Sequence, residues 1–208
     1  MIDPNIRSIL GGPIDYASVD LGSELVAVAD KLKAVAFLDM PLEVSGSPVT
    51  STDHMITYRE NFGSARAYLL SNHTLDGVNV IPGSMLAAGL TAKIDKTRGF
   101  WWSPSNQEIL GVTGVKWAHD YIIGDPDSQA NLLNENEVAT IIREKGFRLW
   151  GNRTLSADPL WMFLNMRRTA DMIEESLLYA HLWAVDSNIT RAYIEFVLEG
   201  VRDYLRHL

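Results

Sequence analysis

The sequence contains no cysteine, no long hydrophobic run and no basic tract. The absence of cysteine excludes disulfides, cysteine-ligated zinc and thiol catalysis, and it fits assembly in a reducing cytoplasm. No apolar run reaches the roughly 18 residues that a membrane-spanning helix needs, so we expect no membrane insertion. The first residues also lack the basic and then apolar layout of a signal peptide.

The charge balance is acidic. The chain carries 26 acidic and 18 basic side chains, and its formal net charge is −8. Because non-specific nucleic-acid binding depends on clustered Lys and Arg, we expect no nucleic-acid partner. With 47% hydrophobic and 21% charged residues, the 208-residue chain can bury a substantial core. We therefore expect one domain over residues 1–208.

The motifs of metal and phosphate sites are missing as well. The five histidines do not show the close spacing of a helical zinc site. His119 and Asp120 are adjacent, but an exposed pair in a loop explains them better than a metal site does. The Gly11-Gly12-Pro13 turn lacks the Lys-Ser/Thr of a P-loop. We therefore expect no metal and no cofactor.

A serine hydrolase is the sharpest enzymatic alternative. Asp39, His54 and Ser84 occur in the chain order of subtilisin-like proteases, and Gly83-Ser84-Met85 resembles the stretch around their nucleophile. His54 would take the Ser84 proton and Asp39 would orient the imidazole. The neighbouring residues do not match, and the three lie in a much shorter stretch than in that family. The simpler interpretation places them at a strand end, on a helix and at a helix start. A small-ligand binding module with an apolar cleft is a further alternative.

The first half of the chain alternates helical and extended patterns. Helices are predicted over 21–32, 50–62 and 84–97, and strands over 34–38 and 65–70. Ser51 or Thr52 is the expected cap of the second helix, and Pro82 precedes the third. Continuous apolar strands are typical of parallel sheets covered on both faces. The order of elements indicates a layered α/β fold.

The middle of the chain is less regular. Loops are expected at 45–50 and 99–106, a short strand at 111–116 and a short helix at 125–134. Runs at 138–143 and 147–150 flank Glu144-Lys145-Gly146 and predict a β-hairpin, because Gly146 can take a positive φ. A single helix over 130–145 is the competing prediction.

The last third predicts an apolar strand and two amphipathic helices. The strand covers 161–168 and ends in an arginine pair. One helical stripe contains Ala170, Ile173, Leu177, Ala180 and Ala184, and the next contains Ile189, Ala192, Phe196, Val201, Leu205 and Leu208. Asp186 and Asn188 offer capping side chains between the two helices.

Four large side chains have structural interpretations. Trp101 and Trp102 are expected to fill the core, with a contact surface as the alternative, because Trp, Tyr and Arg dominate interface energies. Arg167 and Arg168 suit carboxylates of the same or a neighbouring subunit, since Arg forms rigid bidentate pairs.

The segment Trp150-Gly151-Asn152-Arg153-Thr154 is expected to end a strand. Trp150 should be buried, and Gly151 should permit tight packing or an unusual backbone angle. Arg153 and Thr154 should supply hydrogen bonds. None of these residues is expected to be catalytic.

Taken in order, these motifs resemble those of contractile tail sheath proteins. The similarity starts with an apolar run that ends at Asp39, and it continues with the helix after Pro82. It includes Asp95-x-x-x-Gly99-x-Trp101-x-x-Pro104-x-Asn106, Trp150-Gly151-x-Arg153-Thr154, Asn165-Met166-Arg167-Arg168 and Asp186-x-Asn188. In that family the chain extends beyond both ends of this region. The sequence therefore looks like a core fragment that lacks the terminal arms.

The resemblance implies a structural subunit without enzymatic activity. Sheath subunits stack as six-fold rings around the tail tube of contractile phages and related injection machines, and triggering at the baseplate drives the tube through the host envelope. The implied fold is an α/β core, distantly similar to subtilisin, that ends in two amphipathic helices. The implied partners are other sheath subunits, the tube and the baseplate, in a virion tail assembled in the bacterial cytoplasm. Without the arms, we expect that this chain alone does not polymerise.

Overall fold

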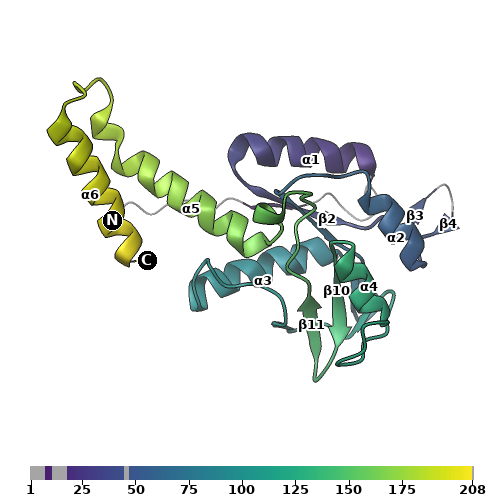
Figure 1. The fold of residues 1–208 in the computed structure, drawn as a ribbon. Helices are drawn as coiled ribbons and strands as arrows, with labels where there is room; N and C mark the ends of the chain where they lie inside the picture. The colour runs from purple at the N-terminus through teal and green to yellow at the C-terminus, as the bar shows by residue number, and fades with distance from the viewer. Residues whose placement is uncertain (1–7, 11–17, 45–46, 208) are drawn as a thin grey trace. The chain divides into compact units, whose positions relative to one another are not determined.

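The computed structural model describes residues 8–10, 18–44 and 47–207 of the chain (Figure 1). The predicted Gly11-Gly12-Pro13 turn lies outside the described residues, as does Leu208 of the last helical stripe. The chain divides into an α/β unit that ends at Thr169 and a helical unit that begins at Ala170. A single domain over residues 1–208 stays a prediction.

A six-stranded sheet forms the centre of the α/β unit. Its spatial order is β1 (Ser8–Leu10), β2 (Val35–Asp39), β5 (Ala67–Leu70), β10 (Val138–Arg143), β11 (Phe147–Trp150) and β8 (Glu108–Ile109). The first four strands are parallel, and the last two add in antiparallel fashion. Every residue of β2 and β5 is buried, which confirms the strands predicted from continuous apolar runs.

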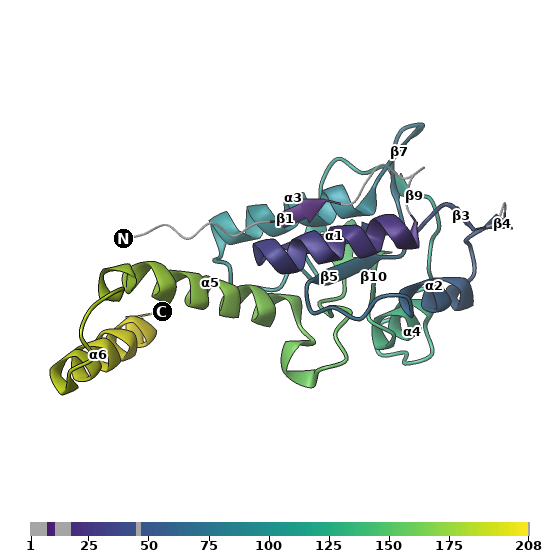
Figure 2. The same ribbon diagram turned by 90° about the horizontal axis from the view of Figure 1, so that it is seen from above.

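Helices cover both faces of this sheet (Figures 1 and 2). They are α1 (Val19–Leu32), α2 (Thr52–Arg59), α3 (Gly83–Thr97) and α4 (Gln129–Glu135). One core cluster joins α1, α2 and α4 to strand residues such as Leu38 and Leu69. The other cluster joins α3 to the neighbouring residues of the same strands, such as Phe37 and Leu70. Alternate strand side chains therefore serve opposite layers, as the pleat requires.

Two small antiparallel arrangements flank the main sheet. β6 (Thr74–Asp76) pairs with β7 (Asn79–Ile81) and with β9 (Gly114–Val115). β3 (Glu43–Val44) pairs with β4 (Ser47–Pro48), so part of the loop predicted at 45–50 is a short strand. The strand predicted at 111–116 is confirmed only for the two residues of β9.

Local signals located the starts of α2 and α3 and the β-hairpin correctly. The Ser51 hydroxyl accepts from the Asp53 N–H and caps α2, and α3 follows Pro82. β10 and β11 form the predicted hairpin, and the competing helix over 130–145 is wrong. Lys145 and Gly146 make the turn with φ of 50° and 108°, values that Gly adopts without strain.

The apolar strand predicted at 161–168 is wrong. Pro159–Trp161 form a 3₁₀ turn (η2), and the helix α5 (Leu164–Ala180) follows. Leu164, Arg167 and Arg168 are spaced as one face of a helix, and all three are buried. The helical period was not recognised in the sequence, because the buried face of α5 includes two arginines and so does not show as an apolar stripe.

The helical unit contains the end of α5, a 3₁₀ turn η3 (Leu182–Ala184) and α6 (Arg191–His207). Its apolar stripe lies largely in solvent, since Ile189, Phe196 and Leu205 are 81%, 64% and 50% exposed. The predicted caps Asp186 and Asn188 are wrong for α6, because the N–H of Tyr193 donates to Thr190 Oγ1 at 3.2 Å. Within the described ranges, no helix is long and apolar enough to cross a membrane.

Candidate functional site: a junction of sequence motifs

The structure brings Asp39 and Ser84 together and leaves His54 elsewhere. The Ser84 N–H donates to Asp39 Oδ1 at 2.8 Å, and the Ser84 hydroxyl donates to Asp39 Oδ2. His54 is exposed on α2. The serine proton is thus held by a carboxylate and not by an imidazole, and both partners are buried. A serine hydrolase needs a base and an accessible hydroxyl, so this alternative is wrong.

The imidazole beside Asp39 belongs to His73. Its Nε2 lies 2.8 Å from the Met40 carbonyl oxygen, and its Nδ1 lies 3.7 Å from Asp39 Oδ1. Because a carbonyl only accepts, Nε2 carries the proton of the neutral ring. Burial lowers the pKa of His73, and burial also raises the pKa of Asp39 against the effect of the Ser84 donors. His73 is fully buried against Trp117, so substrate has no access to it.

Asp39 acts as the N-terminal cap of α3 from another element. The helix follows Pro82, which makes no side-chain cap hydrogen bond, so its first N–H groups need another acceptor. A carboxylate in this position also interacts favourably with the helix dipole. Gly83 permits the close approach, because a Cβ there would lie 2.5 Å from the carbonyl oxygen of Asn72.

Three segments that contain quoted motifs meet in the α/β unit. They are residues 99–106, 150–154 and 161–168, and we call them together the motif junction. The first contact joins the loop after α3 to the end of β11. The Asn106 N–H donates to the Leu149 carbonyl at 2.6 Å, and the Gly151 N–H donates to Ser105 Oγ at 3.0 Å. The loop and the strand end are therefore fixed to one another.

Gly151 lies at the centre of the motif junction. Its φ is 134°, and a Cβ there would lie 2.6 Å from Asn134 Oδ1 and 2.9 Å from the Cα of Ala139. Its carbonyl accepts a hydrogen bond of 2.8 Å from the buried Tyr68 hydroxyl. Burial raises the pKa of Tyr68, so this hydroxyl keeps its proton and remains a donor. Both the unusual angle and the tight packing predicted for Gly151 are confirmed.

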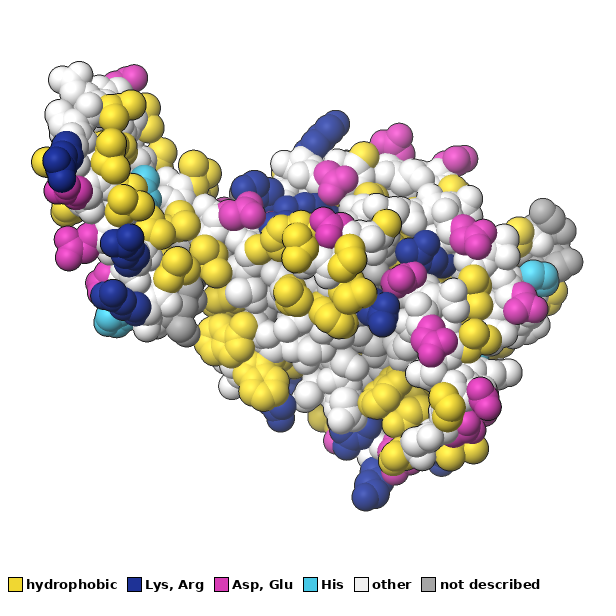
Figure 3. All heavy atoms as spheres, viewed as in Figure 1, with side chains coloured by type: hydrophobic (Ala, Val, Ile, Leu, Met, Phe, Trp, Pro, Cys, Tyr) yellow, Lys and Arg dark blue, Asp and Glu magenta, His cyan; other side chains and the backbone are white. Residues whose placement is uncertain are grey.

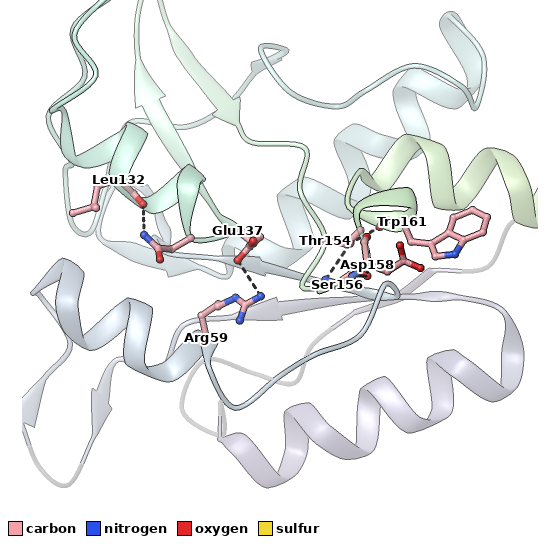
Figure 4. A network of polar contacts seen from close by, with 8 residues as sticks. Arg59, Leu132, Glu137, Thr154, Ser156, Asp158 and Trp161 are labelled. Carbon is pink, nitrogen blue, oxygen red and sulfur yellow. Dashed lines mark hydrogen bonds and ion pairs between the residues drawn. The ribbon is translucent and has the colours of Figure 1, made fainter.

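The segment after Gly151 is tied to the start of α5. Asn152 Nδ2 donates to Asn165 Oδ1 at 2.7 Å, and Asn165 Nδ2 donates to the Trp101 carbonyl at 3.1 Å. Thr154 Oγ1 donates to the Trp161 carbonyl at 2.8 Å (Figure 4). Two asparagines and one threonine thus join all three motifs by hydrogen bonds.

Figure 4 also shows contacts of the neighbouring turn and of α2. The Asp158 N–H donates to Ser156 Oγ at 3.0 Å. The Asp158 carboxylate accepts from the Leu160 N–H at 2.9 Å and so caps η2. Arg59 on α2 forms an ion pair of 2.9 Å with Glu137, which follows α4. The first two of these contacts are local to the turn, whereas the ion pair connects α2 to a residue far along the chain.

The arginine pair serves two different contacts. Arg168 is buried and makes two charge-assisted hydrogen bonds to Asp95 on α3, one of them 2.9 Å from Nη1 to Oδ1. Arg167 lies over the ring of Trp161, 4.1 Å from its centroid. The prediction that this pair binds a carboxylate of its own chain is confirmed for Arg168.

The two adjacent tryptophans do not fill the core. Trp101 and Trp102 are each 48% exposed, so the core prediction is wrong and the contact-surface alternative stands. The ring of Phe100 meets Trp101 edge to face at 5.0 Å, and Arg98 lies 5.4 Å from the centroid of Trp102. The tryptophans therefore form part of the surface of the loop, next to a cationic side chain.

The other residues named in the sequence analysis range from buried to exposed. Pro104 is buried. The prediction of a buried Trp150 is wrong, because Trp150 is only partly buried at the end of β11, where its ring meets the Tyr121 ring at 5.0 Å. Arg153 forms an antiparallel bridge with Phe163. Asn188 is exposed in the helical unit and takes no part in the motif junction.

Sequence reasoning missed the roles of Tyr68, His73 and Asp95. Tyr68 and His73 gave no local signal, because their partners are brought near only by the fold. Asp95 could have been found by asking which carboxylate on a neighbouring helix neutralises a buried arginine. Among the described residues, no group of three His, Asp or Glu side chains is placed to hold a metal.

The fold is that of sheath proteins of contractile machines. It matches the helical sheath of the anti-feeding prophage in the contracted state with a TM-score of 0.73 and 23% identity, over 96% of this chain and 54% of that chain. Residues 8–155 match the family described as the phage tail sheath protein central domain. The chain therefore belongs to the phage tail sheath family.

Relatives with higher identity agree with this assignment. The chain is 40% identical over 207 residues to a putative prophage major tail sheath protein of Pseudomonas aeruginosa strain UCBPP-PA14, covering 96% of this chain and 52% of the relative. It is 34% identical over 207 residues to the tail sheath protein of Escherichia phage P2, covering 96% and 50%. The chain spans about half the length of these curated relatives.

Proposed function

We propose that the chain is the core of a structural subunit of a contractile tail sheath. The observation that carries this proposal is its 40% identity, over 96% of its length, to a prophage tail sheath protein. The subunit would polymerise around the tail tube and contract to drive the tube through the host envelope. It is a structural protein and not an enzyme, as the buried contact between Ser84 and Asp39 also supports.

The motif junction suits this mechanical role. Contraction is a rigid-body rearrangement of subunits between two packings, so each subunit must keep its internal geometry while its outer contacts change. Bonds from Gly151, Asn165 and Arg168 hold the loop after α3, the end of β11 and the start of α5 together. We infer that these contacts keep the core rigid during contraction.

The proposal includes the partners and the location. The subunit would contact other sheath subunits in six-fold rings, the tail tube and the baseplate, without binding nucleic acid or inserting into a membrane. It would act in the virion tail after assembly in the bacterial cytoplasm. Residues 1–208 would form one sheath core domain, and a distant likeness to subtilisin would be a matter of fold alone.

A chimeric sheath tests the proposal. The matching half of the Pseudomonas aeruginosa relative is replaced by this chain, and negative-stain electron microscopy counts tails with a sheath. We expect contractile sheaths from the chimera and none from a chimera with Gly151→Val, which disrupts the motif junction. A chimera that is folded by circular dichroism but never forms sheaths would contradict the proposal.

A second assay separates the structural role from hydrolysis. A serine-reactive fluorophosphonate probe should leave the chain unlabelled, because the Ser84 hydroxyl is buried and donates to Asp39. Labelling of the wild type that disappears in Ser84→Ala would instead show a reactive serine.

A further inference from the structure

One exposed surface of the α/β unit combines tryptophan with basic side chains. Trp101 and Trp102 are each 48% exposed, and Arg98 lies 5.4 Å from the Trp102 ring centroid. Lys93 and Lys96 are exposed on the last turns of α3. We call these five residues the aromatic-basic surface, and Figure 3 shows hydrophobic side chains beside basic ones over this part of the fold.

The character of the aromatic-basic surface is that of a contact site. Asp95, the acidic residue between the two lysines, is bound to Arg168 and so is directed inward. Exposed tryptophan and arginine side chains are the residues that contribute most to the binding energy of protein interfaces. A partner for this surface should therefore be apolar in part and acidic in part.

A second exposed surface has those properties. Residues 117–142 include five Asp and Glu and neither Lys nor Arg. Ile122 and Ile123, in the loop before α4, are 59% and 72% exposed and lie between Asp120 and the acidic pair Asp125 and Asp127. We call residues 120–127 the acidic loop.

The acidic loop has a defined shape. Asp120 Oδ1 accepts from the Gln129 N–H at 2.9 Å, and Asp125 Oδ1 accepts from the Asp127 N–H at 3.0 Å. The Asp125 N–H donates to the Ile122 carbonyl at 3.2 Å. A loop fixed in this way loses little conformational entropy when it binds.

The two surfaces lie at opposite ends of the α/β unit. The C-terminal end of α3 and the chain before α4 are far apart in both ribbon views (Figures 1 and 2). One copy cannot therefore bring its own two surfaces into contact. Contact between two copies would be head to tail, and it would leave one unused surface at each end of the pair.

We propose that the aromatic-basic surface of one copy of this chain binds the acidic loop of a second copy. The inference rests on the proposed function, since a sheath is an array of identical subunits, and it names two of the surfaces that meet in that array. Trp101 and Trp102 cover Ile122 and Ile123, while the basic side chains face the carboxylates. Exposed charges at the rim orient the pair more than they strengthen it, which agrees with the expectation that this chain alone does not form tubes.

The absence of cysteine allows a direct test by crosslinking. Thr97→Cys places a thiol beside the aromatic-basic surface, and Ile122→Cys places one in the acidic loop. The two variants are mixed with a short bismaleimide, and crosslinked peptides are identified by mass spectrometry. We expect the 97–122 crosslink to exceed the 97–97 and 122–122 crosslinks about fivefold. It should weaken at about 500 mM salt, because salt screens exposed charges.

A charge swap makes the test specific. Lys93→Glu with Lys96→Glu in the first partner, or Asp125→Lys with Asp127→Lys in the second, should each abolish the excess of the 97–122 crosslink. Combining both reversals should restore it, and the matched pair Lys31→Glu with Lys145→Glu should leave it unchanged. Equal amounts of the three crosslinks, or reversals without effect in variants folded by circular dichroism, would overturn the proposal.

The crosslinking result and the chimera result separate the two proposals. Random crosslinks together with assembled chimeric sheaths would remove these two surfaces and leave the sheath function standing. A specific, swappable crosslink together with folded chimeras that never form sheaths would remove the sheath function and keep the contact.

Discussion

Asp39 at the end of β2 accepts two hydrogen bonds from Ser84, one from its N–H and one from its hydroxyl, and so fastens the start of α3 to the central sheet. Both residues are buried. The pairing explains why an Asp and a Ser that are typical of a hydrolase occur here without a catalytic histidine. Their chemistry satisfies a helix end that Pro82 leaves without a side-chain cap.

Removing the carboxylate should destabilise the fold. Asp39→Ala leaves the buried N–H and hydroxyl of Ser84 without an acceptor, which costs about 1–3 kcal/mol of unfolding free energy. Urea denaturation followed by circular dichroism measures the change. The control is Asp20→Ala in the exposed first turn of α1, which should change the unfolding free energy by less than about 0.5 kcal/mol. Equal losses in both variants would contradict the capping role.

Acid should weaken the fold through His73. Burial lowers the pKa of His73 from its ordinary 6.5, so the folded state resists a proton that the unfolded chain takes up. The stabilising contribution of neutral His73 is complete above pH 6.5 and is lost as pH falls toward the folded pKa. The slope is at most about 1.4 kcal/mol per pH unit for one proton. Between pH 7.5 and pH 5, the wild type should lose unfolding free energy relative to His73→Gln, because Gln does not take up a proton. Parallel curves for the two chains would exclude His73 as the cause.

Asp39 should act with the opposite sign. Burial raises its pKa above the ordinary 3.8, so the folded state holds the proton more firmly than the unfolded chain does. That contribution is complete below pH 3.8 and is lost as pH rises through the folded pKa. Asp39→Asn keeps the shape and cannot ionise, so this variant should gain unfolding free energy relative to the wild type as pH rises. A difference between the two chains that is independent of pH would contradict the raised pKa.

Gly151 should not tolerate a side chain. Gly151→Ala combines a strained φ of 134° with a contact of 2.9 Å to the Cα of Ala139, and backbone strain alone costs about 1–3 kcal/mol. The matched control is Gly89→Ala in α3, where a Cβ would meet nothing within 4 Å. That change should stabilise the helix by about 0.5–1 kcal/mol. Thermal unfolding of both variants tests the pair, and a neutral Gly151→Ala would show that the motif junction can relax.

Arg168 and Asp95 should show strong coupling. Asp95→Ala leaves a buried guanidinium without its carboxylate, a loss of about 3–5 kcal/mol. Arg168→Met removes the charge as well, so the double variant should be more stable than the sum of the single losses implies. A double-mutant cycle in urea measures the coupling, which we expect to exceed about 1 kcal/mol. Additive losses would show that the pair contributes nothing beyond its separate side chains.

The sequence predicted the elements whose signals are local. The apolar runs of β2 and β5 need no partner to be recognised, and neither does the cap of α2 at Ser51. Gly146 marked the turn of the β10–β11 hairpin in the same way. Each of these depends on residues that are close together in the chain.

The failures depend on residues brought together by the fold. The start of α5 looked like a strand because the carboxylate that makes Arg168 tolerable inside lies 73 residues earlier, on α3. The exposure of Trp101 and Trp102 is decided by the packing around a loop, which no periodicity reports. Asp39 could be assigned to a strand end, but its imidazole neighbour proved to be His73 and not His54.

The pair of Arg168 and Asp95 also gives the start of α5 a second attachment to the core, besides its backbone. Arg168 lies in the first turns of α5 and is bound to Asp95 on α3, and the start of α3 is bound to Asp39 at the end of β2. A load on the first turns of α5 would therefore be shared between α3 and the sheet, and the peptide bond before Leu164 would not carry it alone.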